Sequence, residues 1–108
     1  YRGECPVNSL DSWQLWSQQY DKGEYHGAHN HGMMNLSCVL YVEFDPKEHL
    51  PTTFYSPFPN PYYGTIHKAQ PPVNEGEIIV FPSLLLHEAP VSPSDKRRTI
   101  MSFNIPLR

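Results

Sequence analysis

The sequence has few of the features that mark nucleic-acid-binding, membrane-spanning or disulfide-stabilised proteins. The net charge is −3 and no basic run is longer than Lys96-Arg97-Arg98, so the electrostatic footprint of a nucleic-acid-binding protein is missing. Apolar runs such as Ile78–Phe81 are far too short to span a bilayer. The two cysteines, Cys5 and Cys38, do not make a disulfide scaffold. We therefore expect no nucleic-acid partner, no membrane span and a location in a reducing compartment, the cytoplasm.

A sustained helical period is also missing, and 12 prolines are spread over the 108 residues, so long helices are not expected. With 39% hydrophobic and 18% charged residues, a chain of this length is expected to form one globular domain, residues 1–108. Segments of strand character lie between turn formers: Ser12–Tyr20, Leu36–Phe44, Ile78–Phe81, Leu84–His87 and Arg98–Ile105. This pattern predicts an all-β fold, a sandwich or barrel of the jelly-roll type.

Two regions show no regular period. Residues 1–12 carry several turn formers and are predicted to be a loop or arm. Residues 45–73 are rich in proline and aromatic residues, and we expect a long excursion with one or two short strands. A loop this long in a compact domain usually has a function. The alternative is a surface loop that its prolines stiffen.

Three of the six histidines fall within six residues, His26 to His31. Positions i and i+2 of a strand point to the same face, so His29 and His31 on one strand would aim two imidazoles at one point. His87 lies 56 positions after His31, at the end of an apolar segment. A jelly roll can bring the two segments together. Imidazole suits Fe, Zn, Cu and Ni, and three protein ligands leave coordination positions open. His29, His31 and His87 are therefore predicted to form a metal site; the alternative is a histidine cluster without a metal.

The other histidines carry no such signal. His26 precedes a glycine, and His49 and His67 fall in the irregular region. His49 and His67 are expected on the surface; His26 is expected there too, with a place next to the metal ligands as the alternative.

Arg98 opens the last strand, eleven residues after His87. The expected inward face of that strand is formed by Arg98, Ile100, Ser102 and Asn104. An arginine inside a barrel has to be paired, because an unpaired buried charge is prohibitively costly. Its planar fork fits a carboxylate in a bidentate manner. The alternative is that Arg98 is exposed as part of a basic cluster.

Taken in order, these motifs resemble the 2-oxoglutarate/Fe(II)-dependent oxygenases. The segments that carry the resemblance are His29-Asn30-His31, Leu36–Val42, Gly76-x5-Pro82-Ser83-x3-His87 and Arg98-x3-Ser102-Phe103-Asn104. The resemblance extends from about Trp13 to Asn104. The sequence is most similar to a small group with His-x-His where most relatives have His-x-Asp.

The resemblance implies a double-stranded β-helix, a cupin-like jelly roll, with Fe(II) at one end of the barrel. His29 and His87 match the two metal histidines of the family. His31 stands where a carboxylate ligand usually lies. A neutral histidine there raises the net charge of the site by one and removes a hard oxygen ligand. Either a carboxylate such as Glu43 replaces it, or the site uses three histidines.

The resemblance also implies a cosubstrate and an activity. Arg98 matches the basic residue that binds the distal carboxylate of 2-oxoglutarate, with Tyr41 and Ser102 as further cosubstrate-binding candidates. The implied enzyme is a dioxygenase that hydroxylates a C–H bond of an unknown substrate. It consumes O2 and converts 2-oxoglutarate to succinate and CO2. Complete oxygenases usually carry N-terminal helices, so the chain is expected to be a fragment that lacks them.

Two other functions remain open. Gly76–His87 fits the second cupin motif, except that Leu84 replaces a glycine and Val91 an asparagine. The first cupin motif needs a glutamate shortly after His-x-His, and the sequence has none there, so the fourth ligand is missing. A cupin would also leave Arg98 unexplained. The second alternative is a non-catalytic β-barrel binding module.

Overall fold

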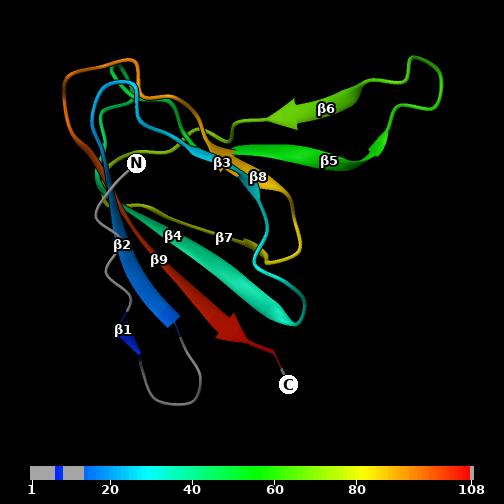
Figure 1. Ribbon diagram of the computed structural model, residues 1–108, viewed down its shortest axis with the longest axis horizontal. Helices are drawn as coiled ribbons and strands as arrows, with labels where there is room; N and C mark the ends of the chain where they lie inside the picture. Colours follow the sequence, from blue (N-terminus) through cyan, green and yellow to red (C-terminus); the bar gives the residue numbers. More distant parts are fainter. Residues whose placement is uncertain (1–6, 9–13, 108) are drawn as a thin grey trace.

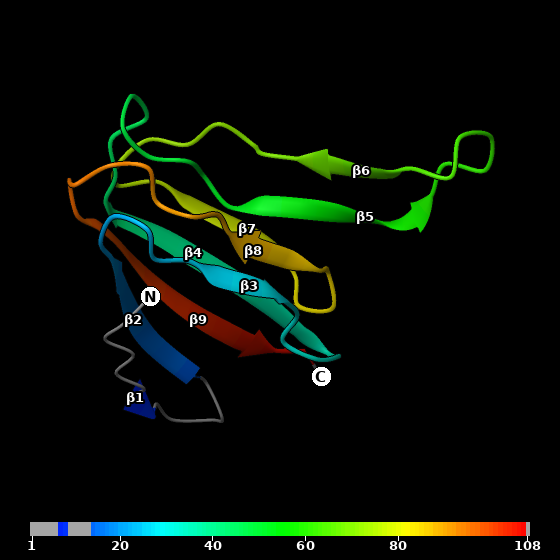
Figure 2. The ribbon, with the colours of Figure 1, turned by 45° about the horizontal axis from the view of Figure 1, so that its top comes forward.

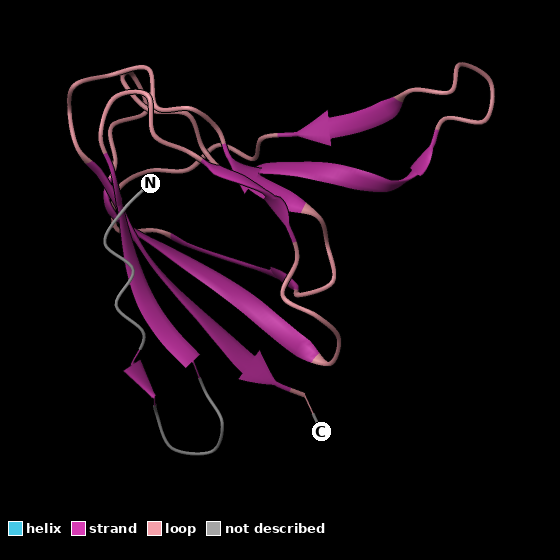
Figure 3. Cartoon of the chain, viewed as in Figure 1, coloured by secondary structure: helices cyan, strands magenta, loops and turns pink. Residues whose placement is uncertain are grey.

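The structure is a computed structural model that describes residues 7–8 and 14–107. This part of the chain consists of strands and loops (Figure 3). It contains no helix that is long and apolar enough to cross a membrane. The strands are β1 (Val7–Asn8), β2 (Gln14–Tyr20), β3 (His26–His29), β4 (Asn35–Glu43), β5 (Thr53–Pro59), β6 (Ile66–Ala69), β7 (Ile78–Pro82), β8 (His87–Ala89) and β9 (Arg98–Pro106).

The strands form two antiparallel sheets that face each other. One has the order β1-β2-β9-β4-β7 and the other the order β3-β8-β5-β6. Figures 1 and 2 show the sheets close together where most loops gather and further apart on the opposite side. The all-β sandwich predicted from the sequence is confirmed. β1 lies within the region predicted to be an arm; most of that region, with Trp13, lies outside the described residues.

β4 and β9 are the long central strands of the five-stranded sheet. Their alternation fits a strand with one face against the core. Arg98, Ile100, Ser102 and Asn104 of β9 are all buried, as predicted for its inward face. The register places Val39 opposite Ser102 and Tyr41 opposite Ile100. The inward face of this sheet therefore mixes apolar core with polar side chains, as a site between the sheets requires.

The strands around the histidines differ from the prediction. β3 ends at His29, so His31 lies in the following loop and not on the same strand. Gly32 (φ 80°) and Met34 (φ 64°) turn the chain there, which a strand cannot do. His87 begins β8 and does not end a strand over 84–87, because the Leu85 N–H donates to the Pro82 carbonyl (3.0 Å) in a turn.

The proline-rich region 45–73 forms a hairpin. It contains two short strands, β5 and β6, as predicted. The hairpin projects beyond the rest of the molecule (Figures 1 and 2), and Phe58, Tyr62 and Tyr63 are exposed there. The base of β5 pairs with β8, with Phe54 opposite His87. The hairpin thus begins beside the histidines and extends away from the sandwich.

Candidate metal centre

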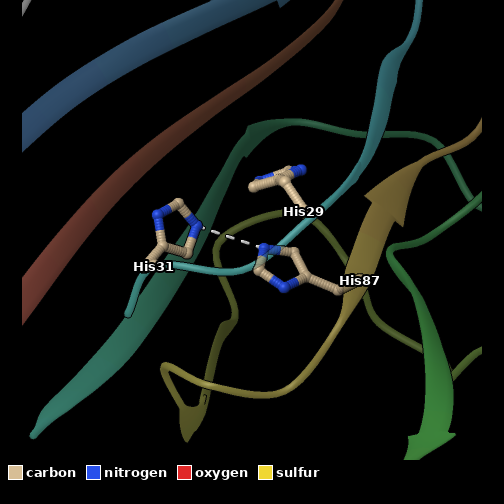
Figure 4. Close-up of side chains that lie close together, drawn as sticks. All are labelled: His29, His31 and His87. Atoms are coloured by element: carbon tan, nitrogen blue, oxygen red, sulfur yellow. Dashed lines mark hydrogen bonds between the residues drawn. The ribbon is translucent and has the colours of Figure 1, made fainter. Parts of the chain in front are cut away.

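His29, His31 and His87 come together between the two sheets. Figure 4 shows the three imidazoles, on β3, on the loop after β3 and on β8. The ring centroids are 4.9 Å (His29–His31), 4.3 Å (His29–His87) and 5.0 Å (His31–His87) apart. One nitrogen of each ring lies within 4.8 Å of the others. The sequence therefore identified the cluster correctly, although the strand geometry used to predict it was wrong.

Backbone carbonyls fix two of the rings. The Nδ1 atom of His29 lies 2.6 Å from the Gly27 oxygen, and Nδ1 of His87 lies 2.8 Å from the Leu85 oxygen. A carbonyl only accepts hydrogen bonds, so both Nδ1 atoms carry the proton. Nε2 of each ring then keeps its lone pair, which is the tautomer that a metal ligand needs. Nε2 of His31 lies 3.2 Å from Nε2 of His87.

Burial keeps two of the rings neutral. The pKa of His31 is lowered to about 4, mainly by burial and in addition by the charges of His87, His29 and His26. Burial also lowers the pKa of His87 to about 4, against the opposing effect of the Leu85 carbonyl. Neutral imidazole is the metal-binding form. At neutral pH the cluster is therefore ready to bind a cation.

His26 joins the cluster, although the sequence placed it on the surface. It is half-buried and stacks on His29 with the centroids 3.9 Å apart. Its Nδ1 lies 3.2 Å from Nε2 of Gln18, whose Oε1 accepts from the Tyr20 hydroxyl (3.3 Å). The spacing of three residues between His26 and His29 was the sequence signal for this contact. The irregular register of β3 against β8 between these two histidines cannot be read from the sequence.

His49 is also wrongly predicted. Only 3% of it is exposed, because its ring ties two loops together. Nδ1 accepts from the Asp45 N–H (2.9 Å) and Nε2 donates to the Lys96 carbonyl (2.7 Å). Such a histidine has a structural role. His67, on β6, is exposed as predicted.

A cleft between the sheets contains the histidine cluster. It has about 400 Å³ of empty space, part of which opens to solvent. Its lining includes Trp16, Tyr20, Val39, Thr52, Ile100 and Ser102 along with the histidines. Ser102 of the predicted site thus lies on the cleft wall. Tyr20 and Thr52 also line the cleft. Tyr20 lies next to Arg98, and Thr52 lies next to Tyr41.

Arg98 is buried, and aromatic rings surround its guanidinium. It is 3% exposed, and none of its three side-chain nitrogens has a hydrogen-bond partner among the described residues. Its guanidinium lies 5.0 Å from the ring centroid of Tyr20 and 5.6 Å from that of Tyr41. Burial lowers the pKa of Arg98, and the two tyrosines act in the opposite direction. The alternative of an exposed basic cluster is excluded; an anion is what this guanidinium lacks.

Tyr41 lies beside Arg98 and is completely buried. Its hydroxyl is 2.5 Å from Oγ1 of Thr52 and accepts from the Thr52 N–H (3.3 Å). The hydroxyl is therefore already engaged within the protein. A cosubstrate would reach it only together with Thr52.

Among the described residues, the cluster that could hold a metal contains three histidines and no carboxylate. Glu43, the acidic residue considered from sequence, binds Arg97 (2.9 Å) and Thr99 instead. Glu88, next to His87, accepts from the Tyr55 hydroxyl. The donor set thus suits a first-row transition metal, but it is not the usual two-histidine, one-carboxylate set for iron.

The family model described as "Putative 2OG-Fe(II) oxygenase" matches residues 14–104. The chain belongs to this family. The match includes all three clustered histidines and Arg98. No protein with curated annotation matches the chain.

Solved structures show that this oxygenase-family chain has the double-stranded β-helix fold. It matches a prolyl-4-hydroxylase from Pseudomonas putida with a TM-score of 0.63 and 21% identity, over 92% of this chain and 54% of that one. It also matches a cupin domain from Bordetella pertussis (TM-score 0.55, 17% identity, 95% and 93% covered). An RmlC-like cupin from Desulfovibrio desulfuricans matches with a TM-score of 0.57 and 11% identity, over 97% of this chain and 82% of that one. The chain spans about half the length of the hydroxylase.

Proposed function

We propose that this protein is a 2-oxoglutarate- and Fe(II)-dependent dioxygenase that hydroxylates a C–H bond of its substrate. Membership of the oxygenase family supports this. The observation that carries it is the guanidinium of Arg98, which has no hydrogen-bond partner among the described residues and is buried in the same sandwich as three converging imidazoles. A cupin that only binds a metal leaves this charge without a function. A dicarboxylate that also binds the metal gives it a partner.

In this proposal His29, His31 and His87 hold the iron through Nε2. The carbonyls of Gly27 and Leu85 orient two of the rings and keep their Nε2 lone pairs free. Bound iron and 2-oxoglutarate together activate O2, releasing succinate and CO2 and supplying the oxygen atom of the product.

Arg98 would bind the distal carboxylate of 2-oxoglutarate. Aromatic rings on several sides hold its guanidinium in place. Tyr41 and Ser102 are the further candidates for contacts with the cosubstrate. Tyr41 would act together with Thr52, and Ser102 would make its contact from the cleft wall. The apolar part of the lining would keep water from the reacting groups.

The direct test is succinate formation from 2-oxoglutarate with Fe(II) and O2. The wild type is expected to turn over, and His87→Ala is expected to lose activity because an iron ligand is gone. Arg98→Ala is expected to raise the KM for 2-oxoglutarate about 10-fold to 100-fold, the loss of one charge-assisted interaction.

Matched controls are available for both variants. His67→Ala removes an exposed histidine outside the cluster, and Arg97→Ala removes an exposed arginine next to Arg98. Both should keep wild-type rates. Equal rates for the wild type, His87→Ala and Arg98→Ala would refute the proposal.

A metal-binding protein that does not use 2-oxoglutarate is the second candidate. The absence of a carboxylate from the histidine cluster favours it. Calorimetric titration separates the two. If the metal-loaded protein binds no 2-oxoglutarate, the second candidate is correct.

A further inference from the structure

His31 is the one histidine of the cluster that does not lie on a strand. Strand pairing fixes His29 and His87, whereas the backbone of His31 belongs to the loop between β3 and β4. This loop contains Gly32 (φ 80°) and Met34 (φ 64°). A left-handed conformation at a non-glycine residue costs energy and persists only where the surroundings hold it. Something outside the loop must therefore fix the position of the His31 ring.

Ser83 makes several of the hydrogen bonds that hold this loop, and the Leu107 N–H donates another to the Met34 carbonyl (2.7 Å). The His31 N–H donates to the Ser83 carbonyl (2.8 Å), and the Ser83 N–H donates to the Asn35 carbonyl (3.0 Å). Between these two bonds, the Ser83 hydroxyl donates to the Gly32 carbonyl (2.6 Å). Ser83 is only 1% exposed whereas Gly32 is exposed, so the hydroxyl ties an exposed loop to the buried turn, and its loss removes that tie.

The same turn also orients His87. Ser83 follows Pro82, whose carbonyl accepts from the Leu85 N–H (3.0 Å). The Leu85 carbonyl in turn lies 2.8 Å from Nδ1 of His87. One four-residue turn therefore contacts the His31 loop on one side and the His87 ring on the other. It sets the 3.2 Å separation of their Nε2 atoms.

We propose that Ser83 is a positioning residue of the metal centre, whose hydroxyl holds the His31 loop at the distance from His87 that a shared metal needs. The proposal rests on the proposed function, because it takes His31 as a ligand. Ser83 acts through the backbone of the loop and does not touch the metal. The contacts of Ser83 explain how His31, a ligand outside a strand, keeps a fixed position.

The test measures Zn²⁺ affinity of the 108-residue chain by competition with a chromophoric chelator. Ser83→Ala is expected to weaken binding about 10-fold to 100-fold, as for other residues that orient ligands. Ser92→Ala is the matched control. Ser92 is equally a buried serine, but its hydroxyl has no hydrogen-bond partner among the described residues. Its loss should leave the affinity unchanged.

A double-mutant cycle shows whether Ser83 acts through His31. In the His31→Ala background, Ser83→Ala should cause no further loss of affinity, because the loop no longer carries a ligand. An equal loss in both backgrounds would mean that Ser83 only stabilises the fold, and would overturn the proposal. If Ser83→Ala does not fold, Ser83→Cys keeps the volume with a weaker donor and should show a smaller loss in the same direction.

The outcomes separate this inference from the proposed function. If His31→Ala binds Zn²⁺ as tightly as the wild type, His31 is not a ligand. The inference for Ser83 and the proposed role of His31 are then both wrong. If His31→Ala weakens binding and Ser83→Ala does not, the inference for Ser83 alone is wrong.

Discussion

Arg98 is the residue at which function and stability oppose each other. A buried guanidinium without a hydrogen-bond partner is costly to the fold, and an apolar residue of similar length would not carry this cost. The sequence predicted its inward position, because the alternation of β9 fixes the face, whereas a carboxylate as its ligand stays a prediction. The surrounding aromatic rings, from β2 and β4, come from distant parts of the chain and could not be placed in advance.

Arg98→Met is predicted to stabilise the protein in the absence of ligands. Removing the unpartnered charge should raise the free energy of unfolding by about 1 kcal/mol or more. For a domain of this size, each kcal/mol of added stability raises Tm by roughly 4 °C to 8 °C. Thermal unfolding followed by circular dichroism measures this change. The same variant should lose the stabilisation that 2-oxoglutarate gives the wild type. A lower Tm for Arg98→Met would mean that the charge has a partner in solution.

The cluster histidines predict a pH dependence of the metal-free protein. The pKa of His31 and of His87 is about 4 in the fold and 6.5 without it. The unfolded state therefore binds more protons between these values, and stability is lost as pH falls from about 6.5 to 4. Measured in chelator, Tm should fall between pH 7 and pH 5, and fall less in a His31→Gln, His87→Gln double variant. Identical pH profiles would contradict the low pKa values.

At the scale of elements, patterning predicted the long strands and missed the short ones around the site. β4 and β9 were recognisable because alternation over nine residues is a strong signal, and β2 was predicted from its apolar residues although its alternation is imperfect. β3 and β8 have four and three residues, and turns next to them decide where the histidines lie. Turn geometry such as the positive φ of Met34 has no clear sequence signal, so the loop position of His31 was missed.

The base of the β5–β6 hairpin is predicted to support the metal centre. Phe54 packs between Phe81 (4.8 Å) and His87 (5.9 Å), so Phe54→Ala should cost about 2 kcal/mol of stability and weaken Zn²⁺ binding. Phe58, on the same strand but 76% exposed, gives the matched control. Phe58→Ala should change stability by less than about 0.5 kcal/mol. Urea unfolding and the chelator competition measure both. Equal effects of the two variants would show that the hairpin base does not support His87.

In the whole molecule, the histidine cluster lies where the two sheets connect. His29 and His87 belong to one sheet, and the His31 loop leads directly into β4 of the other. A metal bound by all three would link the sheets at the cleft, and any ligand that binds only the folded state raises its stability. Sequence alone predicted a jelly roll but not how the sheets pair, since β-pairing between distant segments depends on contacts that only the complete fold makes.

Metal addition should therefore stabilise the protein and metal removal should reverse this. With free Zn²⁺ at about 1,000 times its Kd, the gain is about 4 kcal/mol. Thermal unfolding with Zn²⁺, and again after excess chelator, measures it. His87→Ala should show a much smaller gain, and His67→Ala the full gain of the wild type. A gain of the same size in His87→Ala would place the metal elsewhere.

Anaerobic calorimetric titration of 2-oxoglutarate shows whether one cleft holds both a metal and 2-oxoglutarate. We expect one molecule bound per Fe(II)-loaded chain, and far weaker binding to the metal-free protein and to Arg98→Ala. Arg97→Ala should bind like the wild type. Binding that is equally tight without the metal and in Arg98→Ala, or no binding to the Fe(II)-loaded wild type, would contradict the proposed function.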